Sequence, residues 1–94
     1  MNIQARFETA RESAVREVAV INKILADLVR TVQLIEIDIA VEEERARVYD
    51  RSDVKYSILA RTLIERRDNL KVTIAALEQR HTERVLREQV ATAA

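Results

Sequence analysis

Apolar residues recur at alternating steps of four and three along the first half of this chain. They are Ala14, Val18, Ile21, Leu25, Leu28, Val32, Ile35 and Ile39, and the spacing continues through Glu42, Ala46 and Tyr49. This spacing puts every member on one face of an α-helix and is typical of a coiled-coil seam. The chain has no glycine and no proline, so no helix-breaking residue interrupts the pattern. The pattern predicts a long helix over residues 3–48.

The second half of the chain carries a seam of its own. Its members are Tyr56, Ala60, Leu63, Arg67, Leu70, Ile74, Leu77 and His81. Between the two seams lies the only interior cluster of turn-forming and capping residues, 49–53. Asp50, followed three residues later by Asp53, resembles a capping box that satisfies the free amides of a helix start. We therefore predict a bend over residues 49–52 and a second helix over residues 53–91.

The two seams are mirror images of each other about the bend. One register pairs Leu25 with Leu77, Leu28 with Ile74, Val32 with Leu70, Ile39 with Leu63 and Ala46 with Tyr56. This register places the turning point at Arg51, where the capping residues independently lie. The predicted fold is all-α, with residues 1–94 forming a single antiparallel two-helix coiled-coil hairpin.

The first helix has more apolar residues than one seam uses. A second, partial stripe lies beside the seam and consists of Val20, Ile24, Leu34, Val41 and Val48. Off the seam of the second helix, Ile58, Val72 and Leu86 recur at equal intervals. Because exposed apolar stripes mark contacts with other chains, Val20, Ile24, Leu34 and Val41 are candidate self-association residues. We expect a homodimer in which two hairpins form a four-helix bundle.

Few residues are available for catalysis or for metal binding. Without cysteine and glycine the chain can form neither thiolate metal sites nor glycine-rich phosphate loops. Glu78 and His81 match the Glu-x-x-His spacing of di-iron bundles, but the register offers too few carboxylates opposite them. The single histidine lies in a seam, so nothing orients it toward a nucleophile. We predict no enzyme activity, no cofactor and no metal; a half-ferritin-like metal protein built from dimerised hairpins is the weakest alternative.

The charges balance, with sixteen basic and sixteen acidic residues. This balance gives no bulk attraction to nucleic acid or to an anionic membrane. The basic residues of the second helix alternate with acidic ones and lack aromatic neighbours for base stacking, which favours a solvated face over an RNA surface. Charged residues interrupt the most apolar window, 20–41, and the N-terminal segment. We therefore expect a cytoplasmic protein without membrane insertion or a signal peptide.

Three segments resemble one known family. They are Ala26–Arg30 (ADLVR), Glu42–Ala46 (EEERA), and Ala60-Arg61 together with Arg66–Leu70 (RRDNL), with an Asp-containing bend and Tyr56 between the last two. Together they resemble the FliJ family of flagellar type III export proteins, which form long coiled-coil hairpins. The resemblance implies a stalk within an export ATPase, with contacts to the export gate and to substrate chaperones. It also implies partner contacts for the bend-proximal Arg61, Arg66 and Arg67.

The residues alone predict less than this resemblance implies. They favour a non-catalytic helical protein that binds other helices, and the resemblance narrows it to an accessory of flagellar export. A self-associating four-helix-bundle adaptor is the alternative function. For Arg67 a second interpretation is open, in which this seam arginine reaches Glu36 or Asp38 across the hairpin.

Overall fold

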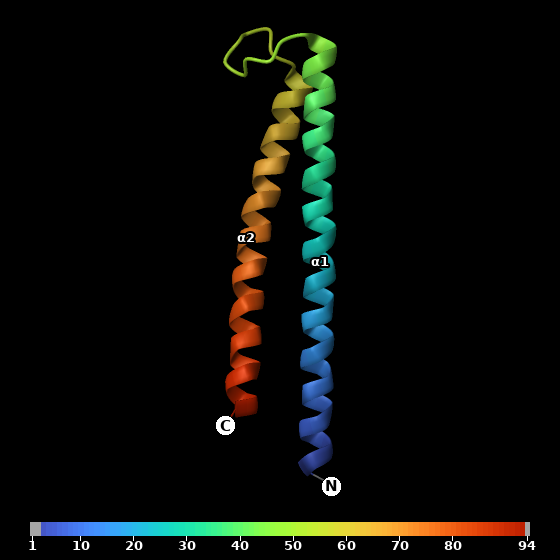
Figure 1. Cartoon of the computed structure of the whole chain (residues 1–94), viewed down its shortest axis with the longest axis vertical. Coiled ribbons are helices and arrows are strands. Elements are labelled where there is room, and N and C mark those ends of the chain that lie inside the picture. Colours follow the sequence, from blue (N-terminus) through green and yellow to red (C-terminus); the bar gives the residue numbers. More distant parts are fainter. Residues whose placement is uncertain (1–2, 94) are drawn as a thin grey trace.

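Two long helices make up the protein. A computed structural model describes residues 3–93, with side-chain surroundings for residues 8–90, so the predicted domain limits at residues 1–2 and 94 lie outside it. Helix α1 spans Ile3–Ala46 and helix α2 spans Ile58–Ala93, and the two run antiparallel beside each other (Figure 1). The rod measures 69 × 17 × 16 Å with a radius of gyration of 20.7 Å. A compact domain of this length would have a radius of gyration of about 12 Å. The predicted all-α hairpin is confirmed.

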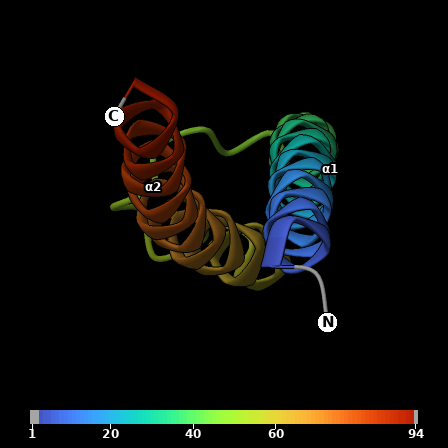
Figure 2. The same cartoon turned by 90° about the horizontal axis from the view of Figure 1, so that it is seen from below.

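The predicted seams form the contact between α1 and α2. All the predicted seam residues are buried or half-buried except Tyr49. The most deeply buried apolar residues are Val32, Ile35, Ile39, Tyr56 and Ala60. These all lie in the half of the hairpin next to the connection, whereas the seam toward the open end is only half-buried. Figures 1 and 2 show the same trend, since the two helices diverge toward the chain termini.

Three polar contacts join the two halves of the hairpin. They join Glu17 to Arg84 at 2.6 Å, Glu36 to Lys71 at 3.6 Å and Glu42 to Ser57 at 3.1 Å. The predicted register places Val85 opposite Glu17, Arg66 opposite Glu36 and Ala60 opposite Glu42. The observed partners lie one, five and three residues from these positions, so only the contact of Glu17 is close to the predicted register. The contacts of Val32 with Leu70 and of Ile39 with Leu63 stay predictions.

Helix α1 ends two residues earlier than predicted. Arg47 follows it with a φ of 59°, in the left-handed region, and its amide donates to the carbonyl of Glu43 at 2.8 Å. A left-handed residue in this position is a common helix terminator, usually glycine. Because the helix has ended, Tyr49 leaves the seam, against our prediction. Its side chain is 54 % exposed and its hydroxyl donates to the carboxylate of Glu44.

The connection spans residues 47–57 and is longer than the predicted bend. Our prediction of Asp50 as the cap of the second helix is wrong, because Asp50 and Asp53 each start a tight turn. The Asp50 carbonyl accepts from the amide of Asp53 (3.1 Å), and its carboxylate accepts from the amide of Ser52 (2.9 Å). In the same way, the Asp53 carbonyl accepts from the amide of Tyr56 (3.1 Å), and the Asp53 carboxylate accepts from the amide of Lys55 (2.8 Å). Aspartate side chains stabilise turns in this way.

Ser57 caps α2. Its hydroxyl accepts from the amide of Ala60 at 3.2 Å, and its carbonyl accepts from the amide of Arg61 at 3.1 Å. These two bonds satisfy amides that the first turn of a helix leaves free. The second helix therefore begins at Ile58, five residues after the predicted start. Neither helix has an apolar stretch long enough to cross a bilayer within the described residues.

Candidate functional site

The predicted second stripe lies exposed along α1, next to the seam. Its exposed fractions are 56 % for Val20, 44 % for Ile24, 52 % for Leu34 and 61 % for Val41. The fifth predicted member, Val48, lies beyond the end of α1 and is half-buried. We call Val20, Ile24, Leu34 and Val41 the α1 stripe. Their heptad positions adjoin the seam on one side, so α2 leaves them uncovered.

Further apolar side chains are exposed on α2 and around the connection. Ile58, Val72 and Leu86 lie on the side of α2 away from the seam, as their spacing predicted, and all are exposed. Val54 in the connection is 99 % exposed, which no periodic pattern predicted. Val29 is also exposed without having been predicted, and it lies on the other side of the α1 seam from the α1 stripe. A heptad assignment would have placed Val29 there.

The three arginines near the bend do not form one cluster. The Arg61 guanidinium lies 5.4 Å from the centre of the Tyr56 ring and donates to the Asp53 carbonyl at 3.0 Å. Arg67 occupies the seam with 17 % of its side chain exposed and pairs with Asp68 at 3.1 Å. The proposed reach of Arg67 to Glu36 or Asp38 is therefore wrong. Arg66 is exposed and forms no ion pair within the described part of the chain.

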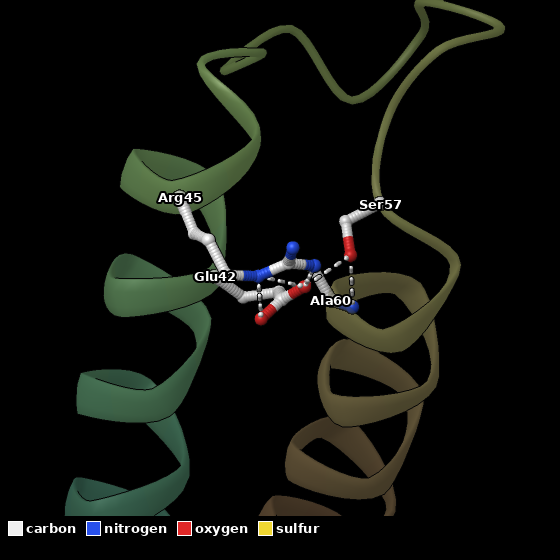
Figure 3. A network of polar contacts seen from close by, with 4 residues as sticks. All are labelled: Glu42, Arg45, Ser57 and Ala60. Carbon is white, nitrogen blue, oxygen red and sulfur yellow. Dashed lines mark hydrogen bonds and ion pairs between the residues drawn. The ribbon is translucent and has the colours of Figure 1, made fainter.

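A buried carboxylate ties the end of α1 to the start of α2. Glu42 occupies a seam position and only 7 % of it is exposed. Its carboxylate accepts hydrogen bonds from Arg45 and from the Ser57 hydroxyl, which itself accepts from the amide of Ala60 (Figure 3). The Arg45 Nε lies 3.1 Å and the Ser57 Oγ 3.1 Å from Glu42 carboxylate oxygens. A buried charge needs such partners, and here they also fix the cap of α2.

The same contacts set the protonation of Glu42. The hydrogen bond from Arg45 is the main cause that lowers the pKa of Glu42 below 4.5, and Ser57 lowers it further, against the opposing effect of burial. The Glu42 carboxylate in turn raises the pKa of Arg45. Both groups stay charged at neutral pH, which suits a structural ion pair. A general acid or base would need a pKa near the working pH.

Tyr56 is the seam residue that lies within the connection itself. It is 3 % exposed, and its hydroxyl lies near Glu43 and Arg51 without completing a hydrogen bond to a described residue. Burial is the main cause that raises the pKa of Tyr56, and the charge of Glu43 adds to it. Tyr56 was predicted as a seam residue and is buried, although it precedes α2. The ring therefore anchors the connection against the helices.

The residues considered for metal binding are not assembled into a site. His81 lies half-buried in the seam, where its Nδ1 has no hydrogen-bond partner, and Glu78 is exposed. The described residues contain no group of three or more potential metal ligands. A di-iron site of the predicted type needs several converging carboxylates. The half-ferritin-like alternative thus has no geometric support.

The features with a functional interpretation are therefore surfaces. They comprise the α1 stripe, the outer face of α2 and Arg66. No protein-family model, curated protein or solved structure matches this chain. The resemblance to the FliJ family rests on the three quoted segments alone.

Proposed function

We propose that this chain is a non-catalytic protein that binds other helices along the side of its hairpin. The observation that carries the proposal is the α1 stripe, whose four large apolar side chains are each 44–61 % exposed. Monomeric proteins rarely leave a row of such residues uncovered. A stripe along a straight helix matches the apolar face of another helix, which is a recurring mode of recognition.

The composition of the stripe also supports a selective contact. Asp27, Thr31 and Asp38 interrupt the apolar residues on the same side of α1. A partner helix must match these polar positions as well as the apolar ones, because a mismatch leaves a charge buried without a partner. The stripe would therefore admit few helices and only in one alignment.

The narrower proposal is an accessory of flagellar export that binds the export ATPase. It rests on the sequence resemblance, and the comparisons with known proteins lend it no support. Of the three arginines near the bend, Arg61 already contacts Asp53 and Tyr56, and Arg67 is paired with Asp68. Arg66 is therefore the best candidate for a partner contact. A low-salt pull-down from a flagellated host should recover the ATPase. If it recovers no export component, the four-helix-bundle adaptor is the better proposal.

Site-specific photocrosslinking in the source cell tests the general proposal. A photoreactive amino acid at position 34, inside the α1 stripe, should give one or a few adducts of discrete mass. The matched control is position 33, where Gln33 is also exposed but points away from the stripe. Equal adduct patterns from the two positions, or none from either, would contradict binding through the stripe.

A further inference from the structure

We propose that the occupant of the α1 stripe is the same stripe of a second copy of this chain, so that two hairpins form a symmetric four-helix bundle. This inference rests on the proposed function, since it names the helix that is bound. Three observations support it: the exposed area of the chain, its net charge and the pattern of charges within the stripe.

The exposed area exceeds what a folded chain of this size normally presents. The protein exposes 7576 Å² at a mass of 10.8 kDa. A compact monomer of that mass exposes about 5,500 Å², which leaves an excess of roughly 2,000 Å². A stable interface of standard size needs about 800 Å² from each partner. The excess over the whole rod is therefore more than twice the area that each hairpin would bury in such a dimer.

The charge distribution suits self-pairing better than pairing with a strongly charged partner. The net charge of the chain is zero, so two copies approach each other without long-range repulsion. A symmetric interface brings one patch against itself, and a patch with charges of a single sign would be repelled. The α1 stripe is interrupted by Asp27 and Asp38 but is also flanked by Lys23, whereas Arg45 is paired with Glu42. Opposite charges are thus available to both copies.

Packing at the open end adds to this argument. The buried seam residues lie in the half next to the connection, and α1 and α2 diverge toward their free ends (Figures 1 and 2). Two helices alone cannot enclose side chains from all directions, whereas four helices around one core can. Val20 and Ile24 lie in the diverging half. A second hairpin laid along α1 would cover them together with the half-buried seam beside them.

Analytical ultracentrifugation of the full chain tests the proposal. From about 1 to 100 µM, the wild-type protein should sediment with twice the chain mass at the upper concentrations. Ile24→Glu should raise the dissociation constant at least about thirtyfold, because it buries a charge at the interface. Val29→Glu is the matched control, since Val29 is 40 % exposed, close to the 44 % of Ile24, but lies across the seam. It should leave the dissociation constant unchanged.

Leu34→Ala is a second variant of the α1 stripe, chosen because it should not impair folding. Alanine favours the helix, so this variant should keep its far-UV circular dichroism and still dissociate at a higher concentration than the wild type, because its dissociation constant is larger. A wild-type monomer throughout the range, or equal weakening by Ile24→Glu and Val29→Glu, would overturn the proposal. A monomer whose position 34 still crosslinks to another protein would refute self-pairing and leave helix binding intact. A monomer without adducts would refute both.

Discussion

Arg47 ends α1 in a conformation that favours glycine, in a chain that has none. Its φ of 59° lies in the left-handed region, where a side chain crowds the following carbonyl. The amide of Arg47 still donates to the Glu43 carbonyl, so the backbone geometry serves to end the helix. Replacing Arg47 by glycine should keep this hydrogen bond and remove the crowding.

The size of the effect follows from three contributions. Relief of the left-handed conformation is worth about 1–2 kcal/mol. The greater freedom of glycine in the unfolded chain costs about 0.5–1 kcal/mol. Loss of the exposed ion pair between Arg47 and Glu44 costs roughly 0.3 kcal/mol. The net stabilisation by Arg47→Gly is about 0.5 kcal/mol, and relative to Arg47→Ala, which also lacks the ion pair, it is about 0.5–1 kcal/mol.

Urea unfolding followed by far-UV circular dichroism, at one fixed protein concentration, measures these differences. The matched control is Ala40, which is exposed within α1, six residues before its end, where glycine should be less stable than alanine by about 1 kcal/mol. Glycine should therefore be better than alanine at position 47 and worse at position 40. If glycine is no better than alanine at position 47, the left-handed helix end is not a source of strain.

Three further predictions concern the seam and the connection. Because Glu42 has a lowered pKa, it stabilises the fold above pH 4.5, and this contribution is lost as the pH falls through the lowered value. In the Glu42→Gln variant, the free energy of unfolding should therefore depend less on pH in the acid range than in the wild type. An unchanged pH dependence would refute the role of the ion pair. Tyr56→Phe removes a hydroxyl without a hydrogen-bond partner and should cost less than about 0.5 kcal/mol in urea unfolding; a cost above about 1 kcal/mol would reveal a partner. Leu70→Ala, at a half-buried seam position, should cost about 1–3 kcal/mol, against less than about 0.5 kcal/mol for Val72→Ala outside the seam, and equal costs would refute the seam position of Leu70.

The sequence was sufficient to predict the seams because periodicity is a property of many residues at once. Ile35, Ile37, Ile39 and Val41 recur at every second residue like the buried face of a β-strand, yet they lie within α1, because the heptads on both sides continue through them. The ends of the helices depend on single residues, and there the prediction failed. Neither glycine nor asparagine marks the left-handed residue at position 47. Aspartates at positions 50 and 53 have the same local preference for a helix cap and for a turn.

What decides between cap and turn at Asp50 is a contact distant in sequence. Tyr56 is buried against the helices, and the two Asp-led turns bring its ring there before α2 begins at Ile58. Ser57 becomes the cap because its hydroxyl can serve both the Ala60 amide and the Glu42 carboxylate. That choice depends on α1 lying alongside, which no local pattern of residues 50–57 contains.

The candidate site, too, could be predicted from the sequence only in part. Heptad positions predicted that the α1 stripe would lie outside the seam, and its exposure agrees. The same positions say nothing about the occupant, because any helix with a matching face would cover the stripe. Ile24 and Val29 have nearly equal exposure in the single hairpin, so glutamate at either position should disturb the isolated fold to a similar extent. A difference between these two variants therefore measures only what a second molecule contributes, and its presence or absence decides whether the α1 stripe is an interface between two copies of this chain.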